Sequence, residues 1–182
     1  MSKERLKKSD LLKKFYNIRD IWFIGEVNDE SARTLLTEMR DIVDDVCCDE
    51  NADELMKNTV IRLNICSIGG DVDPGWAICN YIKNCPIPVW THNSGTAQSM
   101  AAAIFMAGKY RSIGQEATMM VHHFQITANG APLEASKLAL IYNNNEKYYA
   151  KMFPGFKLKE QSGDQFFSSD EVVKNGWADF IM

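Results

Sequence analysis

Short apolar runs alternate with amphipathic segments along almost the whole chain, and this alternation limits the possible folds more than any other feature. The pattern is typical of α/β proteins, in which right-handed crossovers connect parallel strands. With 182 residues, the chain is long enough for one domain with its own core, which we expect over residues 1–182. Strands are predicted at 21–24, 60–65, 88–91, 110–113, 118–124 and 177–181, and helices at 10–17, from 28 or 29 to about 46, 74–84, 97–107, 133–152 and around 172–174.

Composition and charge argue against two classes of partner. The net charge is −4 and the pI about 5.4, so no nucleic-acid partner is expected. No apolar run reaches membrane-spanning length, and the basic stretch Met1–Lys8 lacks the apolar core of a signal peptide, so we expect no membrane segment. The five cysteines follow no metal-binding spacing, which indicates reduced thiols, no metal site and a cytoplasm-like compartment.

The stretch Ser94–Gly108 is the most distinctive part of the chain. It follows a short strand and combines an expected tight turn at Gly95 with small or helix-forming residues from Ala97 on. Ser99 is therefore predicted in the first turn of a buried helix, near unpaired backbone N–H groups and the positive end of the helix dipole. That position favours negative charge on a neighbouring carbonyl oxygen. The alternative is that Ser99 is only a small residue that lets the helix pack closely.

Two further features supply partners for this serine. Gly69 and Gly70 lie between a strand and a helix, where paired glycines let backbone N–H groups point into a site without an obstructing side chain. His122 stands at the end of an apolar strand, where it is either a hydrogen-bonded core residue or a general base. His123 is a rival on the opposite face of the strand, and His92 is expected at the surface or in a supporting role.

Together these residues predict serine hydrolase chemistry. Ser99 would attack a carbonyl, His122 would accept its proton, and the N–H groups of Gly70 and Met100 would bind the oxyanion. The Gly-x-Ser-x-Gly elbow is absent from this stretch, so an ordinary α/β-hydrolase is disfavoured.

Several short motifs occur in an order that is specific to one family. From about Asp10 onward the chain resembles the ClpP family, the proteolytic subunits of the Clp protease, within the Clp/crotonase superfamily. The motifs are Phe23–Asp29, Ser67–Gly70, Ala97–Ala101, Met119–His122 and Phe166–Glu171, the last followed by Gly176 and Asp179.

The resemblance implies a fold and an assembly. The fold is a repeated ββα superhelix with a protruding handle, a strand plus a long helix at about 125–152, and an N-terminal axial segment and helix at about 1–20. Heptameric rings would stack into a tetradecamer, or form a mixed ring with a related subunit. A hexameric AAA+ Clp ATPase would deliver unfolded polypeptides, which Gln125, Ile126 and Thr127 would bind as an added strand. No cofactor is implied, and the location would be the cytoplasm, or the host cytoplasm if the chain is virus-borne.

The chain departs from the family pattern in two respects, the catalytic acid and the ATPase-docking positions. Counting back from Phe166, the catalytic aspartate of the family falls on Glu160, and the nearest aspartate is Asp164, so either acid is a candidate for orienting the histidine. Where many members carry aromatic groups for ATPase docking, this chain has polar residues, which predicts a more polar docking pocket. These polar residues are Arg62, Asn64 and Ser112.

Two other functions remain open at this point. One is a catalytically weak or inactive ClpP paralogue that builds or regulates mixed rings, which the presence of both Ser99 and His122 disfavours. The other is a crotonase-like enzyme acting on acyl-CoA thioesters, for which the sequence contains no sign of an adenine pocket.

Overall fold

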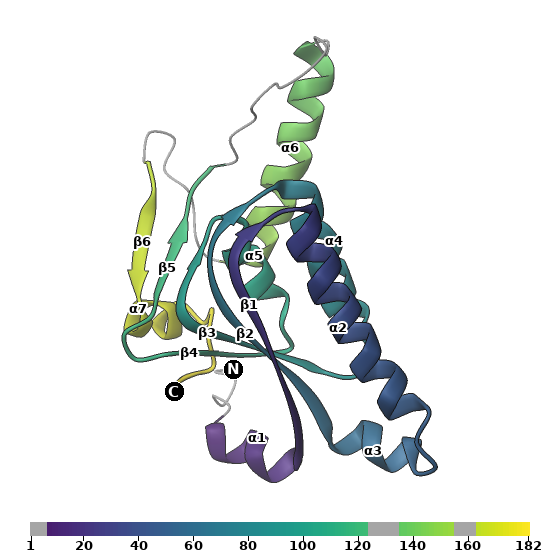
Figure 1. Ribbon diagram of the computed structural model, residues 1–182. Helices are drawn as coiled ribbons and strands as arrows, with labels where there is room; N and C mark the ends of the chain where they lie inside the picture. The colour runs from purple at the N-terminus through teal and green to yellow at the C-terminus, as the bar shows by residue number, and fades with distance from the viewer. Residues whose placement is uncertain (1–6, 124–134, 155–162) are drawn as a thin grey trace.

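The computed structural model describes residues 7–123, 135–154 and 163–182. Its strands and helices alternate as the sequence predicts (Figure 1). The strands are β1 (Asn17–Val27), β2 (Thr59–Gly70), β3 (Val89–Gln98), β4 (Tyr110–Ile113), β5 (Thr118–Val121), β6 (Gln165–Ser168) and β7 (Phe180–Ile181). The helices are α1 (Lys8–Lys14), α2 (Asp29–Cys47), α3 (Ala52–Asn58), α4 (Val72–Asn84), α5 (Met100–Ala107), α6 (Ala135–Met152) and α7 (Ser169–Lys174).

The strands form one sheet that forks after β3. Along the main path the order is β1-β2-β3-β4-β7, and all of these pairs are parallel. The first half of β3 pairs with β4, whereas its last residues, Thr96 to Gln98, pair with β5. Strand β6 then adds to β5 in the antiparallel direction. The predicted α/β class with parallel strands is therefore confirmed.

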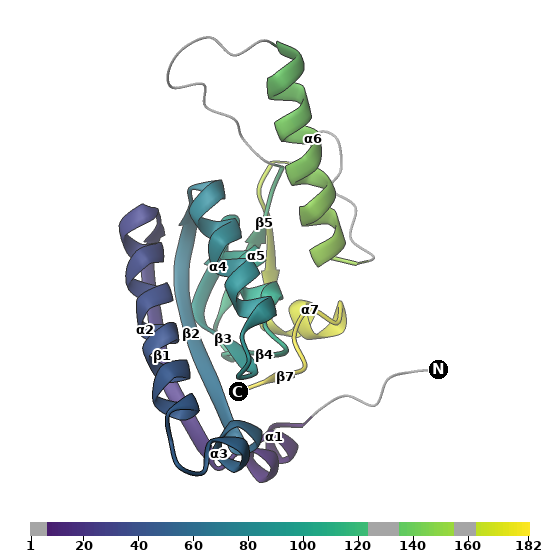
Figure 2. The same ribbon diagram turned by 90° about the vertical axis from the view of Figure 1, so that its right-hand side faces the viewer.

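Helices α2, α4 and α5 cover one face of this sheet (Figure 2). Every second residue of β2 points toward these helices and belongs to the main core, as expected for a strand with one face against helices. These residues are Ile61, Leu63 and Ile65. Helix α2 is capped by Asn28, whose side chain accepts a hydrogen bond from the backbone N–H of Ser31. Its buried stripe has the predicted helical spacing and consists of Ala32, Leu35, Met39, Ile42 and Val46.

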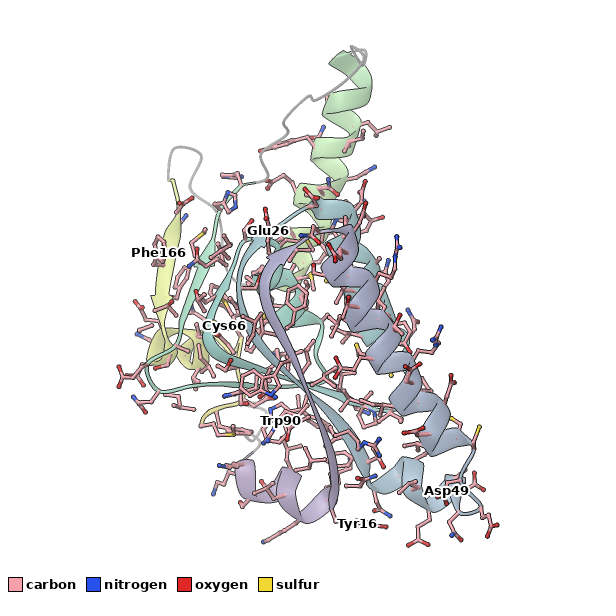
Figure 3. All side chains as sticks on the ribbon, viewed as in Figure 1. Tyr16, Glu26, Asp49, Cys66, Trp90 and Phe166 are labelled. Carbon is pink, nitrogen blue, oxygen red and sulfur yellow. The ribbon has the colours of Figure 1, made fainter. Side chains whose placement is uncertain are left out.

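A smaller apolar cluster lies on the other face of the sheet, where α1 packs. Leu11 of α1 and Phe15, the C-cap of this helix, pack with Val60 of β2 and Trp90 of β3. Trp90, labelled in Figure 3, is completely buried. Helix α1 begins earlier than predicted, with Lys7 as its N-cap. Asp10 is not the cap, because its carboxylate instead accepts a hydrogen bond of 3.1 Å from the backbone N–H of Lys7.

Four other predictions about local structure were wrong. The acidic stretch Asp44–Lys57, for which the sequence predicts the end of a helix and a surface loop, contains most of the separate helix α3. Strand β2 continues to Gly70, and β3 continues through Gly95, because pairing with the neighbouring parallel strands extends both beyond their apolar runs. The last strand is limited to Phe180–Ile181, since Trp177 and Ala178 turn back after α7 instead of pairing.

Helix α6 projects beyond the edge of the sheet (Figure 1). The helix agrees with the long helix predicted at 133–152 over Ala135–Met152, the part of that range that the structure describes. The strand part of the expected handle, with Gln125, Ile126 and Thr127, lies outside the described residues.

Candidate active site

The carboxyl ends of β2, β3 and β5 meet at one edge of the sheet. Because these strands are parallel, the residues that follow them come together in space. Gly70 ends β2, Ser99 follows β3 directly and His122 follows β5 directly. The structure therefore brings together Gly70, Ser99 and His122, as predicted from the sequence.

Ser99 and His122 are within hydrogen-bond distance of each other. The Ser99 Oγ and His122 Nε2 atoms are 2.6 Å apart, and both residues are half-buried. Ser99 is the N-cap of α5 and not, as predicted, a residue of its first turn. Its φ of 52° and ψ of −121° make it the one non-glycine residue with positive φ in the described part of the chain. Such backbone strain persists only where the surroundings enforce it, and it is common at functional sites.

The backbone of Ser99 is held from both sides. Its N–H donates to the carbonyl of Met120 on β5, at 2.9 Å. Its carbonyl accepts hydrogen bonds from the N–H of Ala102, at 3.0 Å, and from the hydroxyl of Tyr149, at 3.1 Å. Tyr149 was not predicted as a site residue, although its spacing of four from Asn145 places both residues on one face of α6.

The end of β2 approaches the serine closely. Gly69 has a φ of 91°, and a Cβ atom added to it would lie 2.6 Å from the Gln98 carbonyl oxygen and 2.8 Å from Ser99 Cβ. That Cβ would also lie 3.0 Å from the backbone nitrogen of Met100, which is the first residue of α5. The first N–H groups of a helix have no intrahelical acceptor. Only glycine allows the loop to pack this close to Ser99 and to the helix start.

A cavity of about 780 Å³ opens beside this arrangement. Ser99, His122, Gly70 and Met100 all line it, so the two predicted oxyanion donors and the Ser–His pair share one space. Tyr149 and Asn145 of α6 also line it.

The rest of the cavity wall is strongly acidic. None of the described residues that line it is Lys or Arg. The ion pairs found within residues 7–123, 135–154 and 163–182 involve none of the cavity's carboxylates. A cleft lined by charge of one sign attracts groups of the opposite sign. The lining aspartates are Asp29, Asp71, Asp73 and Asp164.

The two alternative histidines have different surroundings. His123 Nδ1 lies 3.2 Å from Glu146 Oε1 on α6, so this ring faces α6 and not the serine. His92 is 7% exposed, which contradicts a surface position, and its Nδ1 lies 2.9 Å from Ser112 Oγ. Of the three histidines of the chain, only His122 is paired with Ser99.

Among the two candidate acids, Asp164 lies within the described residues and lines the cavity, whereas Glu160 lies outside them. Val121 and Gln165 form the last pair of the antiparallel β5–β6 ladder, and His122 and Asp164 adjoin this pair in the chain. Both residues also line the cavity. No carboxylate of the described residues forms a hydrogen bond with the His122 ring.

The sheet face near α1 carries the polar residues expected there. Arg62 Nη2 donates to Asp20 Oδ2 at 2.7 Å, and Asn64 donates to Asp20 Oδ1 at 3.0 Å. The Arg62 guanidinium lies 5.1 Å from the centroid of the Trp90 ring, and the Trp90 indole N–H donates to Ser112 Oγ at 2.8 Å. The polar side chains thus pair with one another and form a connected network.

Neither a metal-binding cluster nor a membrane-spanning helix occurs in the part of the chain that the structure describes. Residues 7–123, 135–154 and 163–182 include no group of three or more His, Cys, Asp or Glu side chains placed to hold a metal ion. Within the same ranges, no helix combines the length and apolarity needed to cross a membrane.

Comparison with known proteins identifies the family. The sequence profile of the family described as Clp protease matches residues 2–182. The ATP-dependent Clp protease proteolytic subunit 2 of Treponema denticola is 31% identical to the chain over 105 residues, which cover 57% of this chain and 48% of that protein. The chain thus matches about half the length of this curated relative. Because the family profile covers nearly every residue, the chain belongs to the Clp protease family.

Proposed function

We propose that this chain is a ClpP-type serine endopeptidase, with Ser99 as nucleophile and His122 as general base. The observation that carries the proposal is the 2.6 Å separation of Ser99 Oγ and His122 Nε2 at the wall of a large cavity. A nucleophile and a base within hydrogen-bond reach are the signature of covalent catalysis.

The reaction follows from the positions of these groups. Ser99 Oγ attacks the peptide carbonyl while His122 Nε2 accepts its proton. The N–H groups of Gly70 and Met100 stabilise the negative charge on the former carbonyl oxygen. The imidazolium then gives its proton to the leaving amine, and water hydrolyses the acyl-enzyme by the same steps. Asp164, or alternatively Glu160, orients the imidazole.

The family also suggests how the peptidase works in the cell. The name of the Treponema relative describes a proteolytic subunit of an ATP-dependent protease. We infer that this chain likewise forms heptameric rings, stacked into a tetradecamer or mixed with a related subunit, as a single peptidase domain in the cytoplasm. An AAA+ Clp ATPase supplies unfolded polypeptides, which bind along residues 125–127. The Arg62–Asp20 network makes the ATPase contact more polar than usual.

Labelling with a fluorescent fluorophosphonate tests the proposal, because this reagent modifies only activated serines. We expect labelling of the wild type on a particle of ring mass and none in Ser99→Ala or His122→Ala. His123→Ala is the matched control and should retain labelling, because its ring faces Glu146. An unlabelled ring would instead indicate a structural or regulatory subunit.

A further inference from the structure

Helix α6 reaches the Ser99 peptide through one side chain. Tyr149 is 2% exposed, and its hydroxyl donates to the Ser99 carbonyl oxygen at 3.1 Å. The Ser99 N–H also donates to Met120 of the neighbouring strand β5, and the Ser99 carbonyl also accepts from N–H groups of α5 itself. Tyr149 therefore connects the strained residue to an element 50 positions away in the chain.

The strain at Ser99 gives this contact its importance. The φ of 52° and ψ of −121° are energetically unfavourable for serine, so this conformation persists only where surrounding contacts stabilise it. A rotation of this peptide would swing Oγ away from His122 Nε2, which is 2.6 Å distant. A donor fixed to the carbonyl opposes that rotation.

The tyrosine is itself firmly held. Its ring packs against Phe153, with centroids 4.9 Å apart, and Phe153 packs edge-on against Trp177 at 5.1 Å. Trp177 in turn contacts Phe167, which pairs with Met119 on β5. This aromatic column thus reaches from the Ser99 carbonyl to β5, the strand that directly precedes His122. Burial, followed by the nearby Glu146 charge, raises the pKa of the Tyr149 hydroxyl, so it stays protonated and remains a donor.

We propose that Tyr149 is a positioning residue for the nucleophile: its hydroxyl fixes the Ser99 peptide in the conformation that aims Oγ at His122. This inference rests on the proposed function of Ser99. Tyr149 acts through the Ser99 carbonyl and takes no part in bond making.

The test is Tyr149→Phe, which removes the hydroxyl and keeps the ring that lines the cavity. We expect the rate constant for fluorophosphonate labelling and kcat for a fluorogenic peptide to fall about three- to tenfold, the rate equivalent of one ordinary hydrogen bond. KM for the peptide should stay unchanged, because the cavity wall keeps its shape.

Two control variants separate positioning from general stability. Tyr148→Phe removes the hydroxyl of a neighbour that is 54% exposed, and should label like the wild type. Thr59→Ala removes a buried hydroxyl that donates to the Leu55 carbonyl, away from the cavity, and should lower Tm without slowing labelling. Labelling of Tyr149→Phe within twofold of the wild type would overturn the proposal, as would equal slowing by Thr59→Ala.

Crystal structures of the wild type and Tyr149→Phe give a readout that does not depend on activity. We expect the variant to show Ser99 relaxed from positive φ or Oγ withdrawn from His122. If the wild type itself is not labelled, the proposed function fails, and these structures alone decide the positioning role. An unchanged Ser99 conformation in the variant would then refute it.

Discussion

Gly69→Ala tests whether the close approach of β2 to Ser99 is essential. Gly25 offers a matched control, because its φ of 104° is similar to the 91° of Gly69, yet nothing lies within 4 Å of a Cβ added there. Alanine at either position has the free-energy cost of a left-handed backbone. Only alanine at Gly69 also clashes with the backbone of Gln98 and Met100. The comparison therefore isolates the steric contribution from the backbone contribution.

The expected loss of stability follows from these two contributions. A left-handed alanine costs about 1–2 kcal/mol, of which about 0.4–1 kcal/mol is offset by the stiffer unfolded chain. For Gly25→Ala this predicts a Tm lower by roughly 1–6 °C in a chain of this size. Overpacking adds about 1–3 kcal/mol for Gly69→Ala, and thus a further decrease of roughly 2–12 °C.

The expected loss of activity follows from the displacement of the loop. The added Cβ would lie 2.6 Å from the Gln98 carbonyl oxygen, where ordinary contact begins at 3.4 Å, so the loop must retreat from Ser99. Misplacement of a catalytic group by about 1 Å costs on the order of a hundredfold in rate. We expect labelling of Gly69→Ala to slow by about that factor, and labelling of Gly25→Ala to stay within twofold of the wild type.

Calorimetry and labelling rates, both measured on ring-sized material well below Tm, provide the assay. If the two variants share the same Tm and label at rates within threefold of each other, the reasoning about close packing is wrong.

Three further predictions concern the acid, the substrate and pH. Asp164→Asn should lower kcat by at least a hundredfold while Glu160→Gln has little effect, because Asp164 lines the cavity; the opposite ranking would assign the role to Glu160. Peptides with Lys or Arg beside the scissile bond should be cleaved on the order of tenfold faster than neutral ones at low salt, and Asp71→Asn with Asp73→Asn should remove this preference, as should high salt. Burial, followed by the Arg62 charge, lowers the pKa of His92 from its ordinary value of 6.5. As the pH falls, the His92 imidazole is therefore protonated in the unfolded chain before it is protonated in the folded chain. The contribution of neutral His92 to the free energy of unfolding should be fully present above pH 6.5 and decrease below it, by at most about 1.4 kcal/mol per pH unit.

The pH prediction is checked by denaturant unfolding between pH 5 and 7.5 with His92→Gln as reference. An identical pH dependence in both proteins would contradict it, since the variant lacks the titrating ring.

The sequence alone determined the alternation of strands and helices, the α2 stripe, and the Ser99, His122 and Gly70 candidates. Periodicity and helix starts depend on near neighbours in the chain, which is why the start of α2 at 28 or 29 was predictable without a structure, and Asn28 is its N-cap. The family motifs are equally local in sequence.

Tertiary structure decided how far the strands extend and which groups meet. The ends of β2 and β3 depend on pairing with distant strands, so β2 runs through its glycines despite their preference for turns. Hydrogen bonds to Met120 on β5 and to Tyr149 on α6 stabilise the positive φ of Ser99, and both residues are distant from it in the chain. The acidic wall of the cavity likewise forms only when Asp29, Asp71 and Asp164 are brought together, because packing joins residues that no sequence window contains.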